Sequence, residues 1–116
     1  MFYKTNIETK TLKNSNYRKV LYTTSNLQLV LMSLKPGEEI GMEKHKGTTQ
    51  FIRVEAGNGL AIIDGKRKYI KDGDVLVINP NTYHNLINIG NEKLKLYTIY
   101  TPPEHSKTLV EKNKIN

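Results

Sequence analysis

The stretch PGEEIGMEKHKGTTQFIRVEAG, residues 36 to 57, decides how the fold is interpreted, because it joins a strand-like pattern to several side chains that can bind a metal ion. Glu43 and His45 are two residues apart, so in an extended segment both side chains project from the same face. After the turn-prone Gly47-Thr48-Thr49, the chain resumes as a strand at Gln50. Gln50 is therefore expected to meet the Glu43 and His45 pair across a hairpin.

Length and composition limit the possible classes of protein. A chain of 116 residues fits one domain with a single core. It contains no cysteine, which excludes both a disulfide framework and a thiolate zinc site. The first twenty residues lack the apolar run of a signal peptide, and no window approaches the ~18 apolar residues of a membrane span. We therefore expect a cytoplasmic protein that has no membrane partner.

The formal net charge is +7, which raises the question of nucleic-acid binding. The lysines are scattered along the chain, however, and they neither cluster on a helix nor alternate with stacking aromatic residues. Net charge alone bears on solubility and non-specific attraction. The sequence therefore predicts no nucleic-acid partner.

Short apolar runs separated by turn signals continue along most of the chain. Residues 27–34 are apolar on both faces, which predicts a central strand that is covered on both sides, and Val75–Ile78 is interpreted as a short buried strand. Asp64-Gly65 favours a type I′ hairpin turn. Further strands are expected at 18–22, 50–54, 59–63, 66–70, 83–88 and 94–100. This pattern is typical of an all-β sandwich or barrel.

We divide the chain into three parts on this basis. Residues 1–20 form an N-terminal arm that leads into the first strand, and residues 21–103 form the β-barrel. Residues 104–116 form a C-terminal tail, in which Thr108-Leu109-Val110-Glu111 matches a capping box and predicts one helical turn at most.

The spacing of glycines and polar residues resembles two motifs of the cupin superfamily, in particular the small single-domain cupins called mannose-6-phosphate isomerase-like. The first motif has the order Gly, His-x-His, Glu, Gly, and the second has the order Gly, Pro-x-Gly, His, Asn. The positions that match are Gly37, Glu43, His45, Gln50 and Gly57 for the first motif, and Gly73, Asn79, Asn81, His84 and Asn88 for the second. Glu43 replaces a histidine, Gln50 replaces the glutamate, and the proline is displaced by one residue to Pro80.

The resemblance implies a double-stranded β-helix, the jelly-roll cupin barrel, and a metal site formed by Glu43, His45, Gln50 and His84. The exchange of His and Glu for Glu and Gln leaves the charge of the set unchanged. Two histidines with one carboxylate accept manganese, iron, zinc, nickel or cobalt, so the identity of the divalent ion stays open. The alternative is a degenerate, metal-free barrel in which these side chains are ordinary polar residues.

Three functions are compatible with such a site. The first is a metal-dependent enzyme of the isomerase or epimerase type, acting on a small sugar-like or hydroxy-carbonyl substrate. Glu43 could be its catalytic base only if it left the metal, and Tyr100 and Tyr97 are weaker candidates chosen from strand position alone. The second is a non-heme iron dioxygenase. The third is a barrel that binds or senses a small ligand without turnover, which the weakly coordinating amide of Gln50 favours.

Two further expectations concern the surface. His105, which follows Pro102-Pro103, is interpreted as a surface residue and Arg53 as a solvated or interface arginine. We also predict a homodimer, because the strand at 27–34 needs cover on two faces and the chain has little spare length to supply it.

Overall fold

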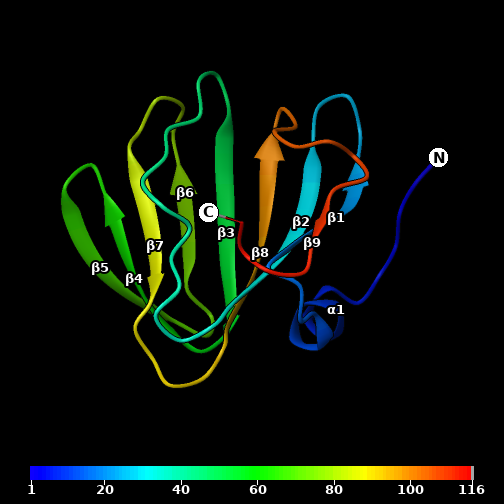
Figure 1. Ribbon diagram of the computed structural model, residues 1–116. Helices are drawn as coiled ribbons and strands as arrows, with labels where there is room; N and C mark the ends of the chain where they lie inside the picture. The colour runs from blue at the N-terminus through cyan, green and yellow to red at the C-terminus, as the bar shows by residue number, and fades with distance from the viewer. Residues whose placement is uncertain (116) are drawn as a thin grey trace.

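The computed structural model describes residues 1–115, which form two antiparallel β-sheets that face each other (Figure 1). The elements are α1 (Ile7–Lys13), β1 (Arg18–Thr23), β2 (Gln28–Leu34), β3 (Thr49–Ala56), β4 (Asn58–Ile63), β5 (Lys66–Lys71), β6 (Val75–Ile78), β7 (His84–Asn88), β8 (Leu94–Thr101) and β9 (Val110–Glu111). The larger sheet has the order β6-β3-β8-β2-β1-β9 and the smaller β5-β4-β7. This arrangement confirms the predicted all-β jelly roll.

The core lies between the sheets and follows from the alternation of side chains along each strand. Interior positions of neighbouring strands fall in register: Gln50 of β3 lies opposite Tyr100 of β8, and Tyr100 lies opposite Gln28 of β2. This polar row marks one end of the interior, and the rows beyond it are mainly apolar. The apolar core includes Val30, Met32, Leu34, Ile52, Val54, Ala61, Leu86, Leu94 and Leu96.

The central strand β2 was predicted correctly, but its cover does not require a second subunit. Helix α1 packs against β2, β3 and β8 on the outer side of the larger sheet, so the chain itself covers part of that face. Asn6 caps the helix by accepting a hydrogen bond from the backbone N–H of Thr9. The Lys95 ammonium of β8 donates to the carbonyl oxygens of Leu12 and Asn14 at the other end of the helix. The reason given for the homodimer is therefore wrong, and the homodimer itself stays a prediction.

The segment before β3 does not form the expected hairpin with Gln50. Residues 36–48 contain no regular strand, and left-handed glycines at Gly41 (φ 98°) and Gly47 (φ 75°) interrupt the extended backbone. Glu43 instead pairs with His84 of β7, and the two residues exchange backbone hydrogen bonds of 2.9 Å. The segment thus runs beside the smaller sheet, and it brings the first motif against the second.

Two shorter elements differ from the predictions. Strand β6 is not buried: it lies at the edge of the larger sheet, with Val75 and Val77 exposed on its outer face. Within residues 104–115 the C-terminal tail forms no helix, because Val110 and Glu111 pair with the open edge of β1 as strand β9. An ion pair of 2.9 Å between Arg18 and Glu111 holds this contact together.

The predicted tight turns are confirmed by the backbone. Asp64 (φ 51°) and Gly65 (φ 77°) both have the left-handed conformation of a type I′ turn, and they connect β4 to β5. Asn81 (φ 63°) accepts the left-handed position that the second motif gives to glycine. This turn places His84 at the start of β7.

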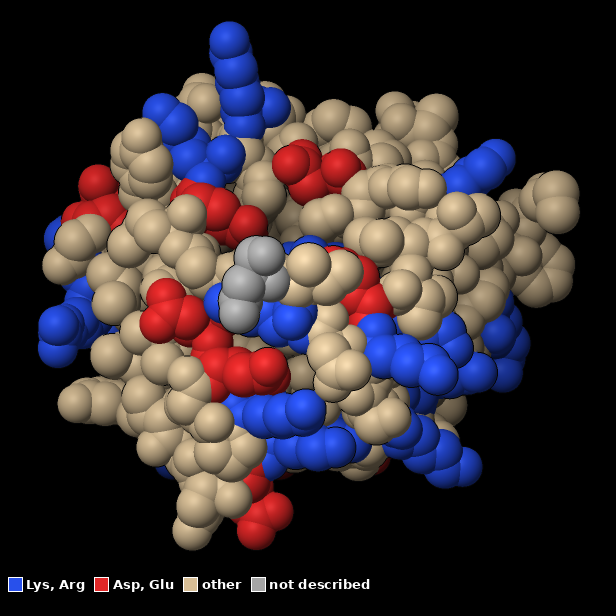
Figure 2. Space-filling view, viewed as in Figure 1, with Lys and Arg blue, Asp and Glu red and all other residues tan. Residues whose placement is uncertain are grey.

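The outer surface carries charges of both signs. Basic and acidic side chains are interspersed over the face shown in Figure 2, and a group of basic side chains gathers at its lower right. The prediction that no nucleic acid binds stays a prediction. Helix α1 has seven residues, and residues 1–115 contain no helix that is long and apolar enough to cross a membrane.

Candidate metal centre

Three side chains that can bind a metal ion meet between the two sheets. The carboxylate of Glu43 and one ring nitrogen each of His45 and His84 lie within 4.8 Å of one another. Glu43 Oε1 is 3.2 Å from His45 Nε2 and 3.5 Å from His84 Nε2. The two imidazole rings are 5.2 Å apart and tilted by 51°. The structure therefore brings together three of the four predicted ligands from segments about forty residues apart.

His84 presents its Nε2 atom to the site because its other ring nitrogen is occupied. Nδ1 lies 2.8 Å from the carbonyl oxygen of Thr82, which can only accept, so Nδ1 carries the proton. The turn that contains Thr82 thereby fixes the ring. His84 is 3% exposed, and its Nε2 atom is buried without a hydrogen-bond partner, since 3.5 Å from Glu43 is too long. A lone pair is left free toward Glu43.

His45 is oriented in the same way by a residue from the C-terminal tail. Its Nδ1 atom lies 3.1 Å from Oε1 of Glu104, while its Nε2 atom faces Glu43. Metal-binding histidines commonly donate the second ring N–H to a carboxylate or a carbonyl, which fixes the tautomer and makes the ligand more basic. Glu104 and the Thr82 carbonyl supply these two partners here.

The electrostatics of the cluster favour an ionised carboxylate. Burial would raise the pKa of Glu43, but its hydrogen bond to His45 and its interaction with the nearby His84 ring lower it to about 2. In turn, the nearby Glu43 carboxylate raises the pKa of His45 above its ordinary value, against the effect of burial, and Glu104 adds to this rise. Without a cation, the cluster therefore favours a proton on His45 more strongly than bulk water does.

Gln50, the fourth predicted ligand, lies at the same end of the interior on β3 and is 1% exposed. Its Nε2 atom donates to Oγ1 of Thr98 at 3.0 Å and to the Tyr100 hydroxyl at 3.3 Å. These two bonds fix the amide and leave Oε1 buried without a partner. An amide oxygen in this state is available to a cation or to a hydrogen-bond donor.

The proposed base Tyr100 is fully buried beside the cluster, with its ring 5.5 Å from that of His45. Burial raises the pKa of the Tyr100 hydroxyl, so the group keeps its proton and suits donation of a hydrogen bond better than it suits proton abstraction. Tyr97 lies on the outer face of β8, against Phe51, and is wrong as a candidate base. Arg53 contacts Glu55 on the outer side of β3, and its side chain is partly exposed.

His105 is not the surface residue that was expected. Its ring packs edge-on against Tyr100 at 5.1 Å, it is only partly exposed, and its Nε2 atom is buried without a hydrogen-bond partner. Burial lowers the pKa of His105, so the ring is neutral at physiological pH. It does not belong to the cluster of three ligand atoms found among residues 1–115.

The donor set fits a divalent cation. A buried polar atom without a partner costs free energy, and two such atoms, His84 Nε2 and Gln50 Oε1, belong to predicted ligands. Neutral imidazole, carboxylate and amide oxygen are ligands for manganese, iron, nickel, cobalt and zinc. A cation bound by Glu43, His45, Gln50 and His84 would give both atoms a partner and would balance the negative charge of the Glu43 carboxylate.

Comparison with known proteins gives the family. A family model described as a cupin domain matches residues 30–100, which include both motifs and all four predicted ligands. The chain belongs to the cupin family. The broader resemblance drawn from the motif spacing is thereby confirmed.

This cupin is similar to several proteins over most of its length. The uncharacterized protein L612 of Acanthamoeba polyphaga mimivirus is 46% identical over 108 residues, covering 89% of this chain and 67% of that protein. The uncharacterized protein YrkC of Bacillus subtilis is 38% identical over 94% of this chain, and this chain spans 62% of its length. The crystal structure of BH2720 from Bacillus halodurans superposes with a TM-score of 0.93 at 39% identity, covering 95% of this chain and 88% of that chain.

Two matches from Thermotoga maritima add a chemical name. An oxalate-binding protein is 32% identical over 59% of this cupin and 56% of its own length. A structure described as a predicted oxalate decarboxylase has a TM-score of 0.63 at 29% identity, with 66% of each chain covered. A putative sugar phosphate isomerase from Acidithiobacillus ferrooxidans, at 21% identity and a TM-score of 0.63, shares the fold alone.

Sequence reasoning missed Glu104, the carboxylate that orients His45 of this cupin. Glu104 lies outside both motifs and follows two prolines in a segment without regular secondary structure, so no periodicity marks it. The available signal was that Pro102-Pro103 ends β8 directly beyond Tyr100, which keeps the next residues near the same end of the barrel. Thr98, which holds Gln50, was missed as well, although it shares the face of Tyr100 on β8.

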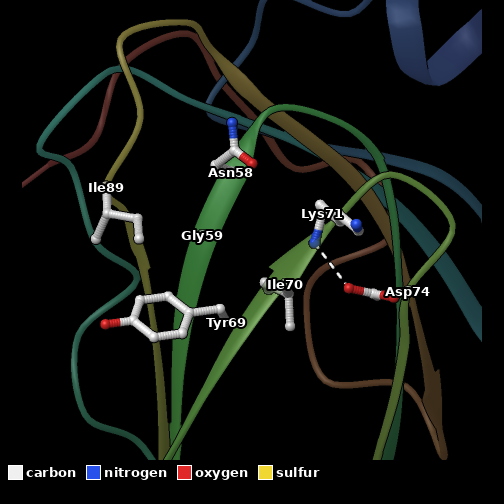
Figure 3. Close-up of a pocket in the computed structure, with 7 residues that line it drawn as sticks. All are labelled: Asn58, Gly59, Tyr69, Ile70, Lys71, Asp74 and Ile89. Carbon is white, nitrogen blue, oxygen red and sulfur yellow. Dashed lines mark hydrogen bonds between the residues drawn. The ribbon is translucent and has the colours of Figure 1, made fainter.

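The site is separate from the cavity shown in Figure 3. That cavity, of about 250 Å³, lies beside β4 and β5, where Tyr69, Ile70 and Ile89 supply most of its apolar wall. A hydrogen bond of 2.8 Å from the Lys71 N–H to Asp74 lies at its edge. None of the predicted metal ligands lines it.

Proposed function

We propose that this cupin binds one divalent metal ion through Glu43, His45, Gln50 and His84, and that the ion receives a small carboxylate or hydroxy-carbonyl compound. The observation that carries the proposal is the convergence of two imidazole Nε2 atoms on one ionised carboxylate, each ring fixed through its Nδ1 atom. The name of the oxalate-binding relative supports the ligand class, since oxalate offers two adjacent oxygen donors.

The residues of the site have distinct roles in this proposal. The bound ion would act as a Lewis acid toward an oxygen of the ligand. Tyr100, which keeps its proton, can donate a hydrogen bond to that ligand or keep Gln50 in place. His45, His84 and Gln50 are buried and Glu43 is partly exposed, so the cluster is largely shielded from bulk water, which strengthens each of these interactions.

Isomerisation requires more than binding, namely a base that moves a proton on the carbon next to the polarised oxygen. Glu43 would have to leave the ion to do this, and a pKa of about 2 makes it a weak base. Tyr100 is protonated. The geometry therefore supports ligand binding at a metal better than it supports the isomerase type, and the mannose-6-phosphate isomerase-like subtype is not needed to explain the site.

A second candidate function is an iron-dependent oxygenase, and one specific observation favours it. The three side chains found together are two histidines and one carboxylate, the set that non-heme iron oxygenases use with open positions. Iron in protein purified without chelators, together with oxygen uptake in the presence of a bound ligand, would favour this function. Manganese or zinc without oxygen uptake would count against it.

The experiment for the main proposal is isothermal titration of metal-free protein with Mn²⁺, followed by titration of the loaded protein with oxalate and with a hydroxy acid. Wild type is expected to bind one ion per chain and then the organic anion. His84→Ala removes a ligand and should abolish both heats, whereas the control His105→Gln changes a histidine outside the cluster and should retain them. Wild-type heats as small as those of His84→Ala would contradict the proposal.

A further inference from the structure

We propose that Gln28 is a positioning residue for the metal centre: its amide holds the backbone at residues 104–105, so that the Glu104 carboxylate keeps the proton of His45 on Nδ1 and leaves Nε2 for the ion. The ion belongs to the proposed function above. The effect of Gln28 on the His45 ring does not depend on it, and it can be measured without metal.

The Gln28 amide uses all of its hydrogen-bonding capacity. Oε1 accepts from the backbone N–H groups of Glu104 (3.2 Å) and His105 (2.9 Å). Nε2 donates to the carbonyl oxygen of His105 (2.7 Å) and to Oγ1 of Thr23 (3.1 Å). With two donors and two acceptors satisfied, the amide has one orientation, because a flipped amide would place its NH₂ group against two N–H donors.

The position of Gln28 explains why these bonds matter. Gln28 is completely buried, on the interior face of β2, and it lies directly opposite Tyr100 of β8. The segment that it holds begins where β8 ends and has no regular secondary structure until β9, so strand pairing does not fix Glu104. The two N–H groups held by Gln28 are those of Glu104 and its neighbour. Gln28 thus anchors the Glu104 carboxylate by holding the backbone of Glu104 itself.

Two carboxylates compete for the proton of His45. Glu43 lies 3.2 Å from Nε2, and Glu104 lies 3.1 Å from Nδ1. In neutral imidazole only one nitrogen carries hydrogen, and a proton on Nε2 blocks that atom as a metal ligand. An anchored Glu104 favours the Nδ1–H tautomer. If Glu104 moves away, Glu43 draws the proton to Nε2.

The test compares His45 in metal-free wild type and in Gln28→Met, which keeps the side-chain volume but cannot make the four bonds. Nitrogen-15 NMR of the histidines at alkaline pH distinguishes the two tautomers. We expect wild type to be mainly Nδ1–H at His45 and Gln28→Met to shift toward Nε2–H. Mn²⁺ titration should show a dissociation constant that is weaker by about tenfold, which is typical for loss of a partner of a metal ligand.

Two comparisons separate positioning from a general loss of structure. In a Glu104→Ala background, Gln28→Met should cause no further loss of Mn²⁺ affinity, because both changes act through the same contact. Glu111→Gln weakens the C-terminal segment at its ion pair with Arg18 without removing the Gln28 hydrogen bonds to residues 104–105, and should leave the His45 tautomer unchanged.

Several results would overturn the inference. An unchanged His45 tautomer in folded Gln28→Met would do so, as would losses of affinity that add in the double variant. If Gln28→Met does not fold, the shorter Gln28→Asn keeps a polar group in the space but sets its amide one methylene back from the N–H groups of Glu104 and His105, and the same tautomer shift is expected. If wild type gives no Mn²⁺ heat, the proposed function fails, while the tautomer measurement still decides the role of Gln28.

Discussion

Glu104 Oε1 lies 3.1 Å from Nδ1 of His45, although 59 residues separate the two in the chain. This contact makes the C-terminal tail part of the candidate metal centre. The first motif supplies His45, the second supplies His84, and the tail supplies Glu104, which orients the His45 ring. These three segments must therefore assemble together. Removal of the side chain that any one of these segments supplies should weaken binding of the ion.

The first prediction concerns this contact directly. Glu104→Ala should weaken Mn²⁺ binding about 10-fold to 100-fold, because His45 loses the partner that fixes its tautomer. Glu104→Gln should weaken it less, since the amide oxygen can still accept the Nδ1–H bond. Isothermal titration measures both. Equal affinity in wild type and Glu104→Ala would show that the carboxylate has no influence on the site.

The second prediction concerns pH. Binding of an ion requires that Nε2 of His45 be free of its proton, and Glu43, with a smaller effect from Glu104, raises the pKa of His45 above its ordinary value of about 6.5. Affinity for Mn²⁺ should therefore be highest above the raised pKa and fall by about tenfold per pH unit below it, as one proton is taken up.

Glu104→Gln provides the matched control for this profile. It removes one of the two carboxylates that raise the pKa of His45, so its affinity should begin to fall at a lower pH than that of wild type. A profile that begins to fall at the same or a higher pH in this variant would refute the assignment of Glu104.

The third prediction concerns the turn between β3 and β4. Gly57 has a φ of 93°, and a Cβ atom there would lie 2.6 Å from the carbonyl oxygen of Lys93. Gly73 has a similar φ of 92°, but a Cβ atom there would meet nothing within 4 Å. Gly73→Ala should lower the free energy of unfolding by about 1–2 kcal/mol from backbone strain alone, and Gly57→Ala by more.

Urea unfolding of the two glycine variants measures this difference. The comparison isolates the close approach of the Lys93 carbonyl, because the two positions share their backbone conformation. Equal losses in Gly57→Ala and Gly73→Ala would mean that the contact with Lys93 is relieved without cost.

The fourth prediction retains the homodimer on different grounds. On the outer face of the larger sheet, Val77 of β6 lies opposite Phe51 of β3, and Phe51 lies opposite Ile99 of β8. Val77 is 62% exposed, so this apolar row is open at its edge. We expect light scattering to give about twice the chain mass of 13.3 kDa. Val77→Lys should give the single-chain mass, whereas Tyr69→Lys, at another exposed site, should not.

The fold could be predicted largely because its signals are local. Alternation of apolar residues identified the strands, Asp64-Gly65 identified one turn, and Asn81 accepted a left-handed position for a reason that lies in its own side chain. The meeting of Glu43 with His84 followed from motif spacing. The sequence could not show that the two residues are joined by backbone pairing beside the smaller sheet.

The remaining features depend on tertiary contacts that leave no periodic pattern. Helix α1 is only seven residues long and is held by Lys95 of β8, so local propensity does not reveal it. The tail pairs with β1 because that strand has an open edge, which outweighs the capping-box pattern at Thr108 to Glu111. The backbone of Glu104, which contacts His45, is held by Gln28 from 76 residues away in the chain, so no local pattern marks it.

The most direct test of the metal centre is anomalous diffraction from a crystal of wild type grown with Mn²⁺. We expect a single strong peak per chain between the Nε2 atoms of His45 and His84, with Glu43 and Gln50 oxygens at about 2.0–2.2 Å. A crystal grown at saturating Mn²⁺ that shows no peak there, or a peak only at surface carboxylates, would contradict the proposed metal site.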